Sequence, residues 1–227
     1  MGGQACVFYG AAQFSKDIDL ALLAEEENYA RLRAALDELD APRIAVPPFD
    51  PAALERGHAV HFRCQRADVR GLRVDVMTRL RDLAPFPILW DRRTTITDEK
   101  GYQFDLLAVE DLVQAKKTQR MKDWPMIDAL VENHFLANAA TPTAERVAFW
   151  LCEARTPHRI IDLAQRFPAE THALLAARPL LEHALRADAE AMRPALDAEV
   201  RTEQEKDRAY WAPLKREMEE FRRLERL

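Results

Sequence analysis

Two carboxylates stand two positions apart near the start of the 227-residue chain, at Asp17 and Asp19. The apolar Ile18 and Leu20 alternate with them, as in a half-buried strand. On a strand, both carboxylates project from one face, about 6.5–7 Å apart along the chain. Unpaired buried charge is costly, and a hard cation with oxygen ligands, such as Mg²⁺, removes that cost. We therefore expect Asp17 and Asp19 to form the core of a divalent-metal site.

A third carboxylate, Asp75, stands in a second alternating run, residues 72–77, whose other face is apolar. If this run lies beside the first, Asp75 joins the same site. Three carboxylates can hold two ions at the spacing of about 3.5–4 Å that is used for in-line phosphoryl displacement. Alternatively, Asp75 forms a salt bridge with Arg73 or Arg79.

The surroundings of the carboxylate pair favour a phosphate ligand. A bare Asp-x-Asp is common on surface strands, but here Gly2-Gly3 lies upstream, where small residues let backbone N–H groups approach phosphate oxygens. Ser15 and Lys16 immediately precede Asp17 and can contact a triphosphate.

With 13 residues between Gly2-Gly3 and Asp17-Ile18-Asp19-Leu20, the sequence resembles the signature of the DNA polymerase β-like nucleotidyltransferase superfamily. The longer string looks like the bacterial minimal and abortive-infection-toxin-like branches; it comprises Gly2-Gly3-Gln4-Ala5, Tyr9-Gly10-Ala11 and Ser15-Lys16-Asp17-Ile18-Asp19-Leu20. Val109 to Lys116, with Arg120 and Lys122-Asp123, resembles a helical motif of the family. The resemblance covers about residues 1–133.

The resemblance implies a site with two Mg²⁺ ions, or Mn²⁺ in their place. Asp17 and Asp19 would ligate both ions, and Asp75 would join them on the catalytic one and help to activate the acceptor hydroxyl. The nucleotide phosphates would be held by Gly2, Gly3, Ser15 and Lys16.

Lys116 and Asp123 complete the expected site. They are seven positions apart and would share a face if the helix were continuous. Lys116 would neutralise phosphate charge in the transition state, and Asp123 would belong to the nucleotide-binding group. The alternatives are a solvated surface lysine and a helix N-cap before Trp124-Pro125.

In the family, the glycine pair follows a first β-strand, whereas here only Met1 precedes it. We therefore expect a misplaced or truncated start. The sequence otherwise predicts an α+β fold: a small mixed or antiparallel sheet with flanking helices over residues 1–107, then a helical region over 108–227. The expected strands are 17–22, 58–65, 72–77, 94–97 and 102–106, with 58–65 and 72–77 forming an antiparallel hairpin.

The expected helices are 25–39, 109–120, 124–133, 143–154, 157–166, 170–177 and 179–192, then a charged helical tail over 195–227 interrupted at Pro213. The segment 156–178 lacks the glycine turn and the basic face of a DNA-binding helix-turn-helix. His58 and His61 form His-x-x-His, but three-residue spacing on a strand points them to opposite faces, so we interpret the pair as structural.

The bulk composition is that of a soluble protein, with 48% hydrophobic and 31% charged residues and a net charge of −5. This charge argues against a globally basic nucleic-acid coat. The dispersed cysteines, Cys6, Cys64 and Cys152, indicate a reducing compartment rather than a disulfide framework or zinc site. Without a signal peptide or a long apolar stretch, a cytoplasmic protein with no membrane partner is expected.

The function we expect is transfer of a nucleoside monophosphate from an NTP to a hydroxyl on a protein, a tRNA or a small molecule. One alternative is a catalytically impaired nucleotidyltransferase-like binding module. Another is an abortive-infection toxin with a cognate antitoxin as its partner. A glycosyltransferase using Asp-x-Asp is a more distant alternative, because no repeated β-α-β pattern accompanies the pair.

Overall fold

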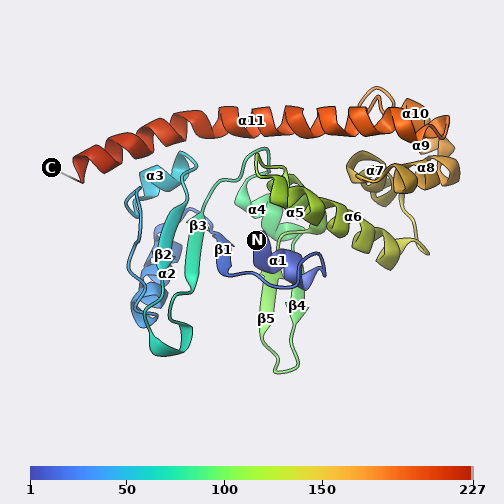
Figure 1. Cartoon of the computed structure of the whole chain (residues 1–227). Coiled ribbons are helices and arrows are strands. Elements are labelled where there is room, and N and C mark those ends of the chain that lie inside the picture. The colour runs from blue at the N-terminus through green and yellow to red at the C-terminus, as the bar shows by residue number, and fades with distance from the viewer. Residues whose placement is uncertain (226–227) are drawn as a thin grey trace. The chain divides into compact units, whose positions relative to one another are not determined.

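A computed structural model describes residues 1–225 of the chain and contains both helices and strands (Figure 1). Contacts divide it into two compact units. The sheet unit comprises residues 1–8, 12–115 and the chain from Arg208 onward; the helical unit comprises 9–11 and 116–207. The expected division at residue 107 therefore differs from this grouping, in which the end of the last helix belongs to the sheet unit.

The sheet unit contains a three-stranded mixed sheet in the order β1-β3-β2. β1 (Asp17–Ala21) runs parallel to β3 (Arg73–Met77), and β2 (Val60–Arg63) runs antiparallel to β3. The expected antiparallel pairing of β2 with β3 is confirmed. β2 is shorter than the expected run 58–65, because it begins after His58 and ends before Cys64.

The apolar face of this sheet forms a core with α2 (Glu26–Glu38). Val74 and Val76 of β3 and Val60 and Phe62 of β2 alternate with polar residues, as a one-sided sheet requires. From α2, the residues that join this cluster are Tyr29, Leu32 and Leu36, at helical spacing. The opposite face of the same strands is thereby left to polar side chains.

A second, two-stranded antiparallel sheet pairs β4 (Thr94–Thr97) with β5 (Gln103–Leu106), as the sequence predicted. Three short helices of this unit were not predicted: α1 (Gly2–Phe8), α3 (Pro51–Glu55) and α4 (Phe86–Asp91). Each has at most seven residues, too short for a clear helical period in the sequence. Further short 3₁₀ turns cover Ala67–Val69 and Met121–Asp123.

The later part of the chain is helical, as expected. Its helices are α5 (Val109–Lys116), α6 (Trp124–Asn138), α7 (Ala144–Glu153), α8 (Pro157–Arg166), α9 (Pro168–Leu174), α10 (Leu181–Leu185) and α11 (Ala189–Leu224). None of the helices within residues 1–225 is long and apolar enough to span a membrane.

Three helix predictions were wrong. The helix expected over 109–120 ends at Lys116, before the 3₁₀ turn at Met121–Asp123. The helix expected over 179–192 is broken between α10 and α11, where Ala187 has a left-handed φ of 54°. The interruption expected at Pro213 does not occur, since α11 continues through it. Contacts in the sheet unit hold α11 on both sides of this proline: a Cβ on Gly57 would meet Tyr210 and Leu214, and Arg56 pairs with Glu217. The last part of the expected tail, 226–227, lies outside the described residues.

Candidate active site

The strand register gathers charged side chains on the polar face of the three-stranded sheet. Asp19 of β1 pairs in register with Asp75 of β3, and Asp75 pairs in turn with His61 of β2. The neighbouring row contains Asp17 opposite Arg73. Because side chains two positions apart on a strand share a face, the two rows form one polar surface. The position of this polar surface follows from the alternation of apolar and polar residues along each strand, which buries the opposite face of the sheet.

Asp75 is the most thoroughly bound group on this surface. Its side chain is 12% exposed, and both of its oxygens accept hydrogen bonds from Arg73, Nε to Oδ1 at 2.7 Å and Nη2 to Oδ2 at 2.8 Å. His61 Nδ1 lies 2.7 Å from Oδ1. The same ring nitrogen lies 3.1 Å from Arg73 Nη2, so it donates to Asp75 when it carries a proton and accepts from Arg73 when it does not. The alternative prediction of a salt bridge between Asp75 and Arg73 is confirmed.

These partners set the ionisation of Asp75. Burial raises the pKa of its carboxyl, but the hydrogen bonds from His61 and Arg73 and their positive charges outweigh it, and the net pKa is lowered. The side chain is therefore an anion at neutral pH, and Arg73 holds it through a bidentate, charge-assisted contact.

The glycine pair lies against Asp19. The backbone N–H of Gly3 lies 3.3 Å from Asp19 Oδ2, and the N-terminal amine of Met1 donates to the Asp19 carbonyl at 2.8 Å. Gly2 has a positive φ of 67°, and a Cβ added to it would lie 1.9 Å from Asp19 Oδ2. No side chain fits between Gly2 and this carboxylate, so the structure requires glycine here.

Ser15 and Lys16 immediately precede β1. The Ser15 hydroxyl donates to the Asp17 carbonyl at 2.9 Å, and a Cβ on Gly3 would lie 2.5 Å from the same hydroxyl oxygen. Lys16 is exposed. The structure thus brings Gly2 and Gly3 beside the Asp19 carboxylate, and Ser15 beside Gly3 and the backbone of Asp17.

The oxygen donors on this surface are of the type that Mg²⁺ prefers. Across residues 1–225, no group of three or more His, Cys, Asp or Glu side chains is arranged to hold a metal ion. Arg73 already occupies both oxygens of Asp75. The residue types therefore fit a divalent ion, whereas the hydrogen bonds of Asp75 compete with it.

Lys116 and Asp123 belong to the helical unit and contact each other. Lys116 Nζ lies 3.4 Å from Asp123 Oδ1, and their side chains are 8% and 1% exposed. The second Asp123 oxygen accepts from Thr118 Oγ1 at 2.6 Å and from Arg120 Nε at 2.7 Å. The surface alternative for Lys116 was wrong, because its side chain is buried. Asp123 stands at the N-cap position of α6, as the other alternative has it, but its side chain makes no capping hydrogen bond. The two residues meet across a loop rather than along a continuous helix.

Sequence reasoning missed His61 as a site residue. His58 and His61 are separate, as expected, but only His58 lies away from the polar surface; it is 1% exposed and binds Glu217 through Nε2 at 2.9 Å. The sequence contained a signal for His61. It lies two positions before Arg63 on the same strand, so the two side chains share a face, and the antiparallel pairing with β3 places His61 on the same face as Asp75.

The comparisons with known proteins add no assignment. No family model, no curated protein and no solved structure matches the chain.

Proposed function

We propose that the chain is a nucleotidyltransferase that moves a nucleoside monophosphate from an NTP to an acceptor hydroxyl. The observation that carries the proposal is the pairing of Asp19 with Asp75 across parallel strands, with Asp17 on the same face and the backbone of Gly3 beside Asp19. A surface with three carboxylates next to a glycine pair suits a cation-bound triphosphate.

In this reaction, the acceptor oxygen forms a bond to the α-phosphorus while the bond to pyrophosphate breaks. Gly2, Gly3 and Ser15 would line the phosphates, with Lys16 at the exposed edge. Asp17, Asp19 and Asp75 would hold Mg²⁺, which neutralises phosphate charge when bound. The acceptor proton would pass to Asp75. Its lowered pKa keeps it ionised but makes it a weak base, so positioning and charge would dominate catalysis.

The test is transfer of label from α-labelled NTPs, with Mg²⁺, to a panel of protein, tRNA and small hydroxyl acceptors. The Asp17→Asn, Asp19→Asn double variant should lose at least about 100-fold in rate. The matched control is Asp37→Asn, which removes one carboxylate from the exposed face of α2 and should keep full activity. Equal labelling by the double variant and the control would refute the proposal.

A second candidate is a binding module that holds an NTP without turnover. The bidentate Arg73–Asp75 contact favours it, because both oxygens of Asp75 already accept hydrogen bonds from Arg73. Calorimetry would then show NTP binding while the same acceptor panel stays unlabelled. Turnover by the wild-type chain would eliminate this candidate.

A further inference from the structure

The hairpin of β2 and β3 carries two arginines whose side chains have no partner in the protein. Arg63 ends β2 and Arg70 stands in the turn before β3, and both are exposed. Within residues 1–225, neither side chain makes a hydrogen bond or an ion pair. Asp40 lies near the hairpin, where its carbonyl accepts from the Gln65 backbone, but its carboxylate contacts neither arginine. The other arginines and the aspartates of the hairpin are paired: Arg66 with Asp68 and Glu38, and Arg73 with Asp75.

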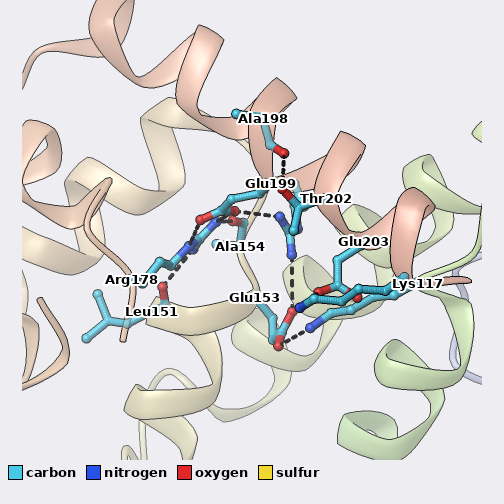
Figure 2. Close-up of polar contacts among 11 residues, drawn as sticks. Lys117, Leu151, Glu153, Ala154, Arg178, Ala198, Glu199, Thr202 and Glu203 are labelled. Carbon is cyan, nitrogen blue, oxygen red and sulfur yellow. Dashed lines mark hydrogen bonds and ion pairs between the residues drawn. The ribbon is translucent and has the colours of Figure 1, made fainter. Parts of the chain in front are cut away.

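The cations around the cavity of the helical unit differ from these two arginines. Figure 2 shows that group, in which Lys117 lies 2.7 Å from Glu153 and Arg178 lies 2.9 Å from Glu199. Arg178 also donates to two backbone carbonyls. The protein itself supplies the partners of these cations, so they do not call for an external anion.

Arg63 lies on the polar surface of the candidate site. In the register of β2 with β3 it stands opposite Arg73, and the next row on this face holds His61 and Asp75. Rows on one face are two positions, about 6.5–7 Å, apart along a strand. Like charges directly opposite each other do not stabilise a sheet, so strand pairing does not account for Arg63. A negatively charged ligand beside Asp75 would give this arginine a partner.

The strand order separates the two ends of the proposed reaction. The glycine pair, which would line the NTP phosphates, contacts Asp19 of β1. In the order β1-β3-β2, β2 is the strand farthest from β1, about 9.5 Å away. Asp75, which would take the acceptor proton, stands on β3 between them. An acceptor that reaches Asp75 from the side opposite the glycine pair therefore passes Arg63.

From the two unpartnered guanidiniums and the place of Arg63 beside Asp75, we propose that the acceptor is the 3′ end of a single-stranded polynucleotide. Its terminal hydroxyl oxygen would form the bond to the α-phosphorus and give its proton to Asp75. Arg63 and then Arg70 would contact the phosphodiesters next to this hydroxyl, because the arginine fork matches the geometry of phosphate oxygens. A single strand suits a carboxylate that is 12% exposed, since its terminal nucleotide can enter alone. This inference rests on the proposed nucleotidyltransferase activity.

The first measurement is binding of a 5′-fluorescein-labelled single-stranded RNA dodecamer, followed by fluorescence anisotropy without NTP. Arg63→Gln and Arg70→Gln should each weaken binding about five-fold, and the double variant about 25-fold. Each substitution should reduce the slope of log affinity against log salt concentration by about 0.7, because one phosphate contact is lost. The matched control, Arg201→Gln, removes an exposed charge from α11 in the helical unit and should change neither quantity.

The second measurement is transfer from α-labelled NTP, with Mg²⁺, to the same dodecamer without the dye. The matched acceptor carries methylphosphonates in place of its last two phosphodiesters, which keeps the 3′-hydroxyl and removes the charges. The wild-type chain should prefer the charged acceptor about 25-fold in kcat/KM, and the double variant of Arg63 and Arg70 should use both acceptors equally.

The outcomes separate this inference from the proposed activity. Transfer only to protein or to uncharged small hydroxyl acceptors would overturn the inference and leave the nucleotidyltransferase proposal intact. RNA binding that needs both arginines, without transfer to any acceptor, would refute the proposed activity and support the phosphodiester contacts alone. No RNA binding, or equal weakening by Arg201→Gln and Arg63→Gln, would overturn the phosphodiester contacts themselves.

Discussion

Replacing Arg73 by Gln should destabilise β3 locally and leave Asp75 as a poorly compensated anion. The substitution removes two charge-assisted hydrogen bonds, at 2.7 and 2.8 Å, from a carboxylate that is 12% exposed. Such bonds contribute about 1.5–3 kcal/mol when buried. Because the Arg73 side chain is 36% exposed, solvent screening reduces the expected loss to about 1–2 kcal/mol.

The pH dependence follows from the sign of the pKa shift. Asp75 has a lowered pKa in the folded protein, so its contribution to stability is present above the unfolded value of about 3.9 and is lost as the pH falls through the folded value. In Arg73→Gln, burial is opposed by His61 alone, so the folded pKa rises. The loss of stability on acidification should therefore be smaller than in the wild type.

The measurement is hydrogen exchange of the β3 amides from about pH 7 down to about pH 2.5, because the contribution of Asp75 is lost below the unfolded pKa of about 3.9 and exchange reports the local opening free energy of the sheet. A double-mutant cycle with Asp75→Asn isolates the pair. Arg63→Gln is the matched control, since Arg63 pairs in register with Arg73 but is exposed. A coupling energy below about 0.5 kcal/mol would refute the reasoning, because the bidentate contact would then stabilise no more than an exposed ion pair.

Three further predictions concern other parts of the chain. Gly2→Ala should displace the Asp19 carboxylate, because the new Cβ would lie 1.9 Å from Oδ2. The left-handed backbone at this position would add about 1 kcal/mol of strain, and NTP binding measured by calorimetry should weaken. His58→Ala should leave Glu217 without its 2.9 Å partner and raise amide exchange in α11 by about ten-fold; unchanged exchange would contradict this. Burial raises the pKa of Asp128, so its charge lowers stability above the unfolded pKa; Asp128→Asn should raise the melting temperature at neutral pH by about 1–3 °C and have less effect near pH 4.

The sheet of the candidate site was predictable because its strands obey a strict period of two. The alternation around Asp17 and around Asp75 identified both strands and the face that each carboxylate occupies. The strand register added what the pattern alone did not contain: Asp19 and Asp75 are direct neighbours, and His61 lies in the same row. Pairing partners depend on the loops between strands, which the alternation does not encode.

Other features depend on packing between segments distant in the sequence. Pro213 was expected to end a helix, but tertiary contacts on both sides overcome the lost hydrogen bond. Asp123 stands where an N-cap is common, yet Lys116, Thr118 and Arg120 occupy its oxygens instead. Local preference indicates what a residue can bind, and the fold determines which partner reaches it.

The Arg73–Asp75 contact has a consequence for how the protein is made. Arg73 and Asp75 stand two positions apart on one strand, so the Arg73 side chain can neutralise Asp75 as soon as β3 is extended. In small metal-dependent domains, by contrast, the binding energy of the ion is part of the folding energy. Here the ionised carboxylate has a partner before any ion arrives. The chain should therefore reach its native state in a chelator such as EDTA, and on the proposed function the ion would be needed for activity but not for the yield of folded protein.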